Sequence, residues 1–242
     1  WSVSTGECEL IFKQPGACVV TSVDVSPDGR SILVGCGDAT ARVFPCTAGA
    51  AAELELRGHR LGVTSCAFSP DMHDVATGSI DTTVRIWHAK IGTCTKLIEV
   101  CDAPVTAVAF SPDGRFIAVG SKDSAVRVAD AKSGACALTL DGLDGHQHFV
   151  TSVAYAPDGL SVVTGSDDRT AKVWDAGTGE HLLTLEGHRG FVTSVAVAPD
   201  AGLFATCAGD GTARVWGAGS GECSRTLGGH GDPATCLAFV RP

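Results

Sequence analysis

Residues 144–158 read DGHQHFVTSVAYAPD, and residues 186–200 read EGHRGFVTSVAVAPD. The two stretches differ at only a few positions and lie 42 residues apart. Their V-T-S-V-A segment alternates in the manner of a β-strand, and the A-P-D that follows favours a tight turn, because proline fixes φ at the second turn position. A strand and a turn that occur twice at this spacing indicate an internal repeat.

The repeat extends along the whole chain. One turn aspartate recurs at intervals of 42 to 45 residues, at Asp28, Asp71, Asp113, Asp158 and Asp200. A second aspartate follows each of these by ten residues, at Asp38, Asp81, Asp123, Asp168 and Asp210. These intervals predict five complete units, 17–58, 59–101, 102–144, 145–186 and 187–228, with partial units at 1–16 and 229–242.

Each unit is expected to form four short strands. The first strands are predicted at 63–68, 105–110, 150–155 and 192–197. The second strand follows an S-P-D-G or A-P-D-G turn, as at 116–120, and the fourth follows a Thr-Gly or Ser-Gly turn, as at 181–185. Four antiparallel strands repeated about every 42 residues are typical of β-propeller blades. The sequence therefore predicts an all-β fold with a single propeller domain over residues 1–242.

The residues at the boundaries and turns of the units resemble those of a known family. A Gly-His pair precedes four of the units, at Gly58-His59, Gly145-His146, Gly187-His188 and Gly229-His230. With the G-S-x-D turns and the Trp174-Asp175 dipeptide, these pairs resemble the WD-repeat (WD40) propellers, although Trp87-His88 and Trp216-Gly217 depart from the full dipeptide. The resemblance covers nearly the whole chain and implies the fold, but no single function, because this fold carries many unrelated ones.

In that family a loop histidine, a second-strand Ser or Thr, the turn aspartate and a third-strand tryptophan form a buried hydrogen-bonded set. The resemblance implies three such sets here: His59, Thr77, Asp81 and Trp87; His146, Thr164, Asp168 and Trp174; His188, Thr206, Asp210 and Trp216. The spacing within the set is the same in all three, as a shared geometry requires. The first and third units have no loop histidine and carry Val34 with Phe44, and Val119 with Ala129, so the network is lost there as a whole.

Aspartate, histidine and a hydroxyl also form hydrolase triads. Three copies in separate blades would mean three active sites, the tryptophan has no role in acyl transfer, and no glycine-flanked nucleophile accompanies the sets. We therefore interpret the sets as structural. The sequence predicts a protein that is not an enzyme, with no catalytic residue, no cofactor and no metal site.

Charge and composition narrow the class of partner. The 242 residues carry a formal net charge of −9 with no basic cluster, so nucleic acid is not expected to bind. No run of eighteen apolar residues occurs, and no membrane insertion is predicted. The eleven cysteines include no C-x-x-C pair. We interpret them, including the equivalent Cys8, Cys94, Cys136 and Cys223, as small buried thiols of an intracellular protein of the cytoplasm, with the nucleus as the alternative.

The two ends of the chain are expected to hold incomplete blades. Residues 7–12 match a fourth strand, and residues 235–240 match a first strand. The second and third strands that would join them are missing from the sequence, so the ends are not expected to pair directly. The sequence favours a piece of a seven-bladed propeller, and an intact propeller of six blades with one irregular blade is the alternative.

Function is expected at positions that do not repeat. The loops before the first strands and the turns after the second strands form the usual contact face in the family. The candidate partner-binding residues there are Arg60, Leu61, Ile80, Lys122, His148, Phe149, Asp167, Arg189 and Phe191. Aromatic residues and arginine often dominate binding energy. The alternatives are that each phenylalanine covers its own blade's first strand and that the cations are merely solvated.

Three functions remain open from the sequence. The favoured one is a non-catalytic scaffold that binds proteins or peptides in a multiprotein complex. The alternative is a regulatory or sensor propeller of a longer protein with a kinase, NTPase or ubiquitin-ligase part. The least favoured, a propeller enzyme or lectin, would need unrepeated polar residues around the channel. Asp24 is the one candidate, because other first strands carry alanine there; it either faces the channel and holds water or a cation, or is a tolerated polar substitution.

Overall fold

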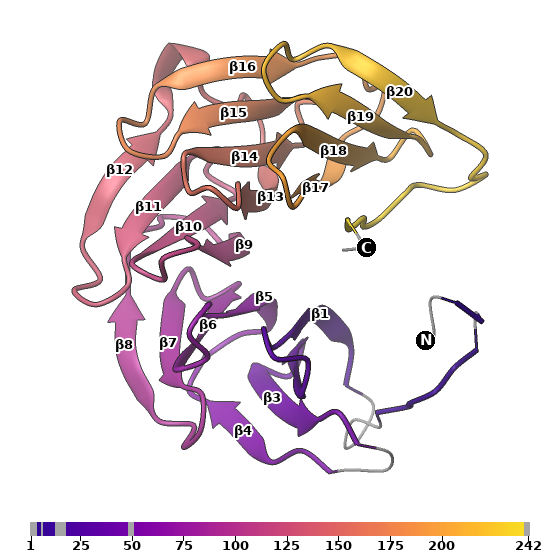
Figure 1. The fold of residues 1–242 in the computed structure, drawn as a ribbon. Helices are drawn as coiled ribbons and strands as arrows, with labels where there is room; N and C mark the ends of the chain where they lie inside the picture. The colour runs from indigo at the N-terminus through magenta and orange to yellow at the C-terminus, as the bar shows by residue number, and fades with distance from the viewer. Residues whose placement is uncertain (1–3, 6, 13–17, 48–50, 240–242) are drawn as a thin grey trace.

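The computed structural model describes residues 4–5, 7–12, 18–47 and 51–239. These residues form five four-stranded antiparallel sheets, each with its strands in chain order from one edge to the other. The sheets follow one another around an arc, as blades 1 to 5 of a propeller (Figure 1). The one helical element of the described ranges is the short 3-10 helix η1 (Gly142–Asp144), between blades 3 and 4. No helix in this part of the chain is long and apolar enough to cross a membrane.

The strands have nearly the same length in every blade. Blade 1 contains β1 (Val20–Val25), β2 (Ser31–Cys36), β3 (Thr40–Pro45) and β4 (Leu54–Arg57). Blade 2 contains β5 (Val63–Phe68), β6 (Asp74–Ser79), β7 (Val84–His88) and β8 (Cys94–Ile98). Blade 3 contains β9 (Val105–Phe110), β10 (Phe116–Ser121), β11 (Val126–Asp130) and β12 (Cys136–Leu140). Blade 4 contains β13 (Val150–Tyr155), β14 (Ser161–Ser166), β15 (Ala171–Asp175) and β16 (His181–Leu185). Blade 5 contains β17 (Val192–Val197), β18 (Leu203–Ala208), β19 (Ala213–Gly217) and β20 (Cys223–Leu227).

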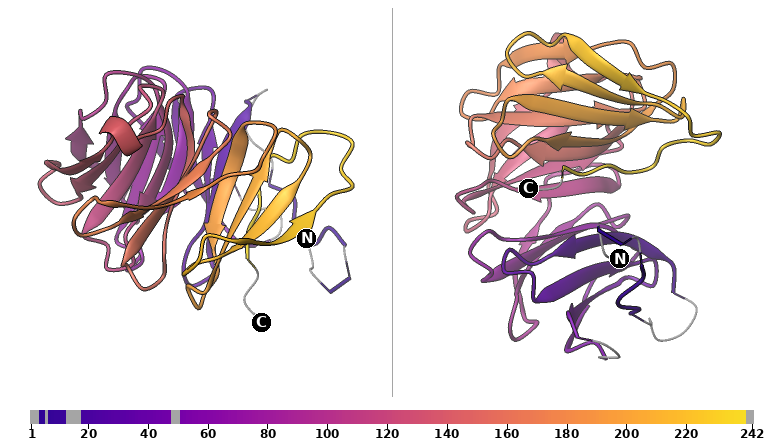
Figure 2. Two further views of the ribbon diagram at one scale, coloured as in Figure 1. Left: turned by 90° about the horizontal axis from the view of Figure 1, so that it is seen from above. Right: turned by 45° about the vertical axis from the view of Figure 1, so that its right-hand side comes forward.

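The four large hydrophobic clusters of the described residues lie between neighbouring blades, and a smaller one is formed by Val34, Cys36 and Phe44 of blade 1. Each of four large clusters combines residues of two neighbouring blades, as where Ile86 and Ile98 of blade 2 meet Val105 and Ile117 of blade 3. The sheets accordingly stand side by side in the views of Figure 2. A single blade could not bury both of its faces, so the repeat unit is stable only in the array.

The V-T-S segment of the inner strands joins blades 1, 2 and 4 to the blade that follows each of them. In blade 3 the segment reads V-T-A, and the Thr106 hydroxyl has no hydrogen-bond partner among the described residues. The threonine hydroxyl donates to a main-chain carbonyl of the following blade: Thr21 to Val63 (2.7 Å), Thr64 to Val105 (2.7 Å) and Thr151 to Val192 (2.6 Å). The next serine accepts a main-chain N–H from that blade: Ser22 from Cys66 (3.2 Å), Ser65 from Val108 (3.1 Å) and Ser152 from Val195 (3.2 Å). The repeated stretch is therefore an inter-blade joint.

Asp24 adds a further joint between blades 1 and 2. Its Oδ2 accepts the main-chain N–H of Phe68 at 2.7 Å, and its Oδ1 accepts that of Val25 at 2.9 Å. Burial raises the pKa of this carboxyl above its ordinary value, although the two hydrogen bonds oppose the shift. Neither sequence-based interpretation anticipated this role, because the partner is a main-chain group that a sequence pattern does not reveal.

The predicted first strands of blades 2 to 5 and the fourth strand at 181–185 are confirmed. The two end strands are not formed: residues 7–12 and 235–239 have no strand structure, and residue 240 lies outside the described residues. Ala234 nevertheless donates to the Ala208 carbonyl at 3.1 Å and accepts from the Thr193 hydroxyl at 2.6 Å. The segment thus begins where a sixth inner strand would lie, but no described residues offer it a second strand.

The expectation of buried thiols is wrong for one group of cysteines. Cys8, Cys94, Cys136 and Cys223 are exposed, and so is Cys236. Three of them open the outermost strands β8, β12 and β20, which no further strand covers. Cys36, Cys66, Cys101 and Cys207 are buried.

Candidate functional site

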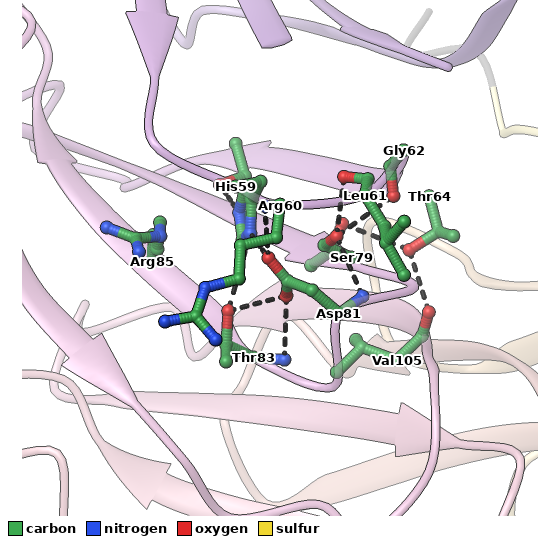
Figure 3. A network of polar contacts seen from close by, with 12 residues as sticks. His59, Arg60, Leu61, Gly62, Thr64, Ser79, Asp81, Thr83, Arg85 and Val105 are labelled. Atoms are coloured by element: carbon green, nitrogen blue, oxygen red, sulfur yellow. Dashed lines mark hydrogen bonds and ion pairs between the residues drawn. The ribbon is translucent and has the colours of Figure 1, made fainter. Parts of the chain in front are cut away.

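The structure brings together the four side chains of each proposed set. In blade 2, His59 Nε2 lies 2.8 Å from Thr77 Oγ1, Trp87 Nε1 donates to the same oxygen at 2.8 Å, and His59 Nδ1 lies 2.9 Å from Asp81 Oδ2 (Figure 3 shows the surroundings of His59 and Asp81). The carboxylate can only accept, so Nδ1 carries the proton and Nε2 accepts the threonine hydroxyl. Burial lowers the pKa of His59 despite its aspartate, which favours this neutral form.

The other two sets repeat this geometry. In blade 4, His146 lies 2.7 Å from Thr164 Oγ1 and 2.8 Å from Asp168 Oδ2, and Trp174 donates to Thr164 at 2.9 Å. In blade 5 the corresponding distances for His188, Thr206, Asp210 and Trp216 are 2.7, 3.2 and 2.9 Å. The three threonines have no exposed surface. Their hydroxyls are therefore placed to hold the blade together and not to attack a substrate.

The aspartate of each set also anchors the loop before the first strand. Asp81 Oδ2 accepts the Arg60 main-chain N–H at 2.8 Å, while Oδ1 accepts the N–H and the hydroxyl of Thr83 at 3.1 and 2.7 Å. Burial alone would raise the pKa of Asp81, but these bonds and that of His59 outweigh it and lower the pKa to about 2. Asp168 and Asp210 hold Gln147 N and Arg189 N in the same way, at 3.1 and 2.7 Å. The buried set thus fixes the backbone of an exposed loop.

Blades 1 and 3 replace the set by an ion pair. Arg42 Nη2 lies 2.7 Å from Asp38 Oδ2, and Arg127 Nη1 lies 2.7 Å from Asp123 Oδ2. The other carboxylate oxygen still accepts from the turn, from Thr40 in blade 1 and from Ala125 N in blade 3. The aspartates retained in these two blades thus bind an arginine as well as the turn, and the loss of the histidine, threonine and tryptophan did not predict the ion pair.

A sequence signal for this role does exist. A basic residue stands four positions after the turn aspartate in all five units: Arg42, Arg85, Arg127, Lys172 and Arg214. Where a histidine is present, the arginine turns to the tryptophan, and the guanidinium carbons of Arg85 and Arg214 lie 5.9 Å from the centroids of the Trp87 and Trp216 rings. In blade 3 the histidine position is taken by Cys101, which is buried beside Arg127.

In blades 2 and 5 the arginines also explain the glycine of the Gly-His pair. A β-carbon at Gly58 would lie 3.1 Å from Arg85 Nη1 and 3.2 Å from the Trp87 ring, and one at Gly187 would lie 2.5 Å from Arg214 Nη1. Both glycines also have positive φ, +156° and +137°. Glycine therefore lets the loop pass close to the side chains that cover the set.

The nine candidate contact residues all lie on one face, which we term the loop face: the loops before the first strands and the turns after the second strands of blades 2 to 5. Main-chain bonds join loop and turn in each blade, as from Ile80 N to Gly62 O (3.0 Å) and from Asp167 N to Phe149 O (3.0 Å). All nine residues are exposed. The largest apolar ones are about half exposed: Leu61 51%, Ile80 46%, Phe149 45% and Phe191 46%.

The two phenylalanines have different surroundings. Lys122 of blade 3 lies with its Nζ 5.6 Å from the centroid of the Phe149 ring of blade 4. The Phe191 ring lies on Gly209 of its own blade, where a β-carbon would be only 2.8 Å from the ring. Phe149 therefore bridges two blades at the loop face, and Phe191 covers a turn of its own blade while keeping one side exposed.

A comparison with protein-family models matches the WD domain, G-beta repeat, over residues 6–44, 52–88, 92–130, 134–175 and 179–217, most of the chain. From 52 onward, each matched segment begins at or just before the outermost strand of one blade and ends at the third strand of the next, so the repeats link successive blades covalently. A comparison with curated proteins found no significant match. The five blades and the three hydrogen-bonded sets agree with these matched repeats. The chain therefore belongs to the WD-repeat (WD40) family.

Proposed function

We propose that this chain is a non-catalytic scaffold that binds a protein or peptide through its loop face. WD40 repeats are generally protein-interaction modules. The observation that carries the proposal is the direct link from buried to exposed groups: the aspartate that closes each set also holds the backbone N–H of Arg60, Gln147 or Arg189. Contact residues on such loops lose little conformational freedom on binding.

The composition of the loop face supports a protein partner. Half-exposed Leu61, Ile80, Phe149 and Phe191 offer apolar area, and Arg60 and Arg189 offer bidentate donors. The net charge of −9 speaks against a nucleic-acid partner. The eleven cysteines are thiols and form no disulfide, and five of them are exposed, which supports a reducing, intracellular compartment.

The test is affinity capture from the protein's own cells with two matched triple variants. The loop-face variant carries Phe149→Ala, Phe191→Ala and Arg189→Ala. The control carries Ile91→Ala, Leu160→Ala and Lys132→Ala, which removes two exposed apolar groups and one cation from the turns at the opposite end of the strands. We expect a stoichiometric partner that is lost only in the loop-face variant, with unfolding midpoints close to that of the unchanged protein.

The reverse result would relocate the site. Lys132 lines a groove of about 870 Å³ between blades 2 and 3, together with Asp74, Lys96, Asp113 and Asp130. A partner lost in the control variant and retained in the loop-face variant would assign binding to the opposite face, where this groove lies. Loss in both folded variants would contradict a single contact face.

A further inference from the structure

A second site lies where the chain enters blade 1. The thiols of Cys18 and Cys36 and a carboxylate oxygen of Asp38 all lie within 4.8 Å of one another. We propose that Cys18 and Cys36 are a redox pair, which closes to a disulfide when a peroxide-class oxidant reaches the protein. The proposal concerns a modification of blade 1 and is independent of partner binding at the loop face.

The repeat itself explains why these two positions meet. Cys18 takes the loop position of Leu61 in blade 2, and Cys36 takes the position of Ser79. The serine hydroxyl donates to the loop carbonyl in three blades: Ser79 to Leu61 (2.9 Å), Ser121 to Ala103 (3.2 Å) and Ser166 to His148 (3.1 Å). The fold thus places the serine position against this loop residue in each of these blades. In blade 1, both positions carry sulfur.

The guanidinium of Arg42 touches both sulfur atoms. Its Nη1 lies 3.1 Å from Cys36 Sγ and 3.9 Å from Cys18 Sγ, and its Nη2 is held by Asp38 at 2.7 Å and by Glu55 at 2.9 Å. A cation beside a thiol stabilises its anionic forms, including sulfenate. The same guanidinium disfavours a metal ion here, because it already binds the Asp38 carboxylate and the Cys36 sulfur. It would also repel a second cation at close range.

The environments of the two thiols give them different roles. Cys18 is partly exposed, whereas Cys36 is buried, and burial raises the pKa of Cys36 to about 11. Cys18 therefore reacts first: its sulfur attacks one peroxide oxygen, the O–O bond breaks, and Cys18 becomes a sulfenic acid as water leaves. The Cys36 sulfur then attacks the Cys18 sulfur, the S–O bond breaks, and the hydroxyl leaves as water with the proton of Cys36. One hydrogen peroxide is reduced, and two thiols are oxidised.

The tryptic cleavage sites of the sequence allow the Cys18–Cys36 disulfide to be located. Trypsin cleaves after Lys13, Arg30 and Arg42, so the peptides 14–30 and 31–42 each contain one cysteine. The reduced chain is treated with hydrogen peroxide, the remaining thiols are blocked with N-ethylmaleimide, and the digest is analysed by mass spectrometry. We expect the two peptides to be joined, to separate after dithiothreitol, and to account for the loss of two hydrogen atoms from the intact mass. The unchanged protein alone gives this result, so no variant needs to fold.

Variants test whether the reaction depends on the pair. Cys18→Ser should abolish the cross-link, whereas Cys101→Ser should leave it unchanged. Cys101 is the matched control, because it also lies beside an arginine, but its neighbour is the Ser121 hydroxyl and not a second thiol. Cys18 and Cys36 that both remain open to alkylation after peroxide, or that join other cysteines, would overturn the proposal. Protection of both thiols by zinc chloride, with no cross-link after peroxide, would assign a metal site in its place.

Discussion

Val105 of blade 3 fills the space that Gly78 of blade 2 leaves open: a β-carbon at Gly78 would lie 2.5 Å from Val105 Cγ1. The contact recurs at three other interfaces, between Gly35 and Val63 (3.0 Å), Gly120 and Val150 (2.7 Å), and Gly165 and Val192 (2.7 Å). The volume of these two residues therefore sets how closely successive blades pack.

Blade 5 shows the same rule with the sizes exchanged. Cys207 stands where the other four blades have glycine, and Ala234 takes the position that valine takes at the other interfaces. Cys207 is fully packed, with 1% of its surface exposed. A larger residue on one side of the interface is thus matched by a smaller residue on the other.

The first prediction follows from this matching. Gly78→Ala should lower the free energy of unfolding by about 1–3 kcal/mol, because the added methyl group overpacks a filled interface. Combining Gly78→Ala with Val105→Ala should cost less than the sum of the two single changes, since the second makes room for the first. Urea unfolding of the four proteins in the cycle measures the coupling, and strictly additive costs would show that the residues do not compete for space.

The second prediction concerns the hydrogen-bonded sets. Thr164→Val should cost about 1–3 kcal/mol of stability, because it leaves the His146 ring nitrogen and the Trp174 N–H buried without their shared partner. His146→Ala should lower the melting temperature for the same reason. The measurement is thermal and urea unfolding, with circular dichroism to verify that the variants still fold. Unchanged unfolding in both would mean that the set does not stabilise the blade.

Much of this architecture could be predicted because the chain repeats it. The first strands at 63–68 and 105–110 have the predicted bounds because the turn before and the turn after each strand are marked by residue type. The His59 set could be proposed because two further sets share its spacing. A single blade would not have supported either inference, since an isolated histidine and threonine 18 residues apart have no predicted relation.

The sequence could not predict which of several possible partners a polar side chain binds. Arg127 and Arg85 occupy the same position of the repeat, but Arg127 pairs with Asp123, whereas Arg85 lies over the Trp87 ring. The difference arises because the aspartate of blade 2 already binds His59. Asp24 bonds to a main-chain N–H of another blade. In both cases the partner is chosen by tertiary packing.

The third prediction is a loss of stability in mild acid. Burial holds the pKa of His59 and His188 below 6.5. At mildly acidic pH the unfolded chain therefore binds more protons at these two residues than the native state does. Their contribution to stability is fully present above about pH 6.5 and is lost as the pH falls towards their folded-state pKa values. The pKa of Asp81 is about 2, so its contribution persists to lower pH.

Urea midpoints measured between about pH 7.5 and 5 should therefore fall with pH, and the NMR signals of both imidazoles in the native protein should titrate at lower pH than those of a free histidine. A midpoint that is level or rises as the solution is acidified would contradict the assigned protonation of the sets.

The fourth prediction compares two arginines at the same position of the repeat. Arg127→Gln should cost about 1.5–3 kcal/mol, because Asp123, only 18% exposed, loses its ion pair with Arg127. Arg85→Gln should cost about 0.5–1 kcal/mol, because Asp81 keeps His59, and the change removes the contact with the Trp87 ring and an exposed hydrogen bond of 3.6 Å to Cys94 Sγ. Urea unfolding at neutral pH ranks the two variants, and high salt should narrow the gap between them by screening the ion pair in the unchanged protein. Equal costs would mean that the arginine serves the same purpose in blades with and without the histidine.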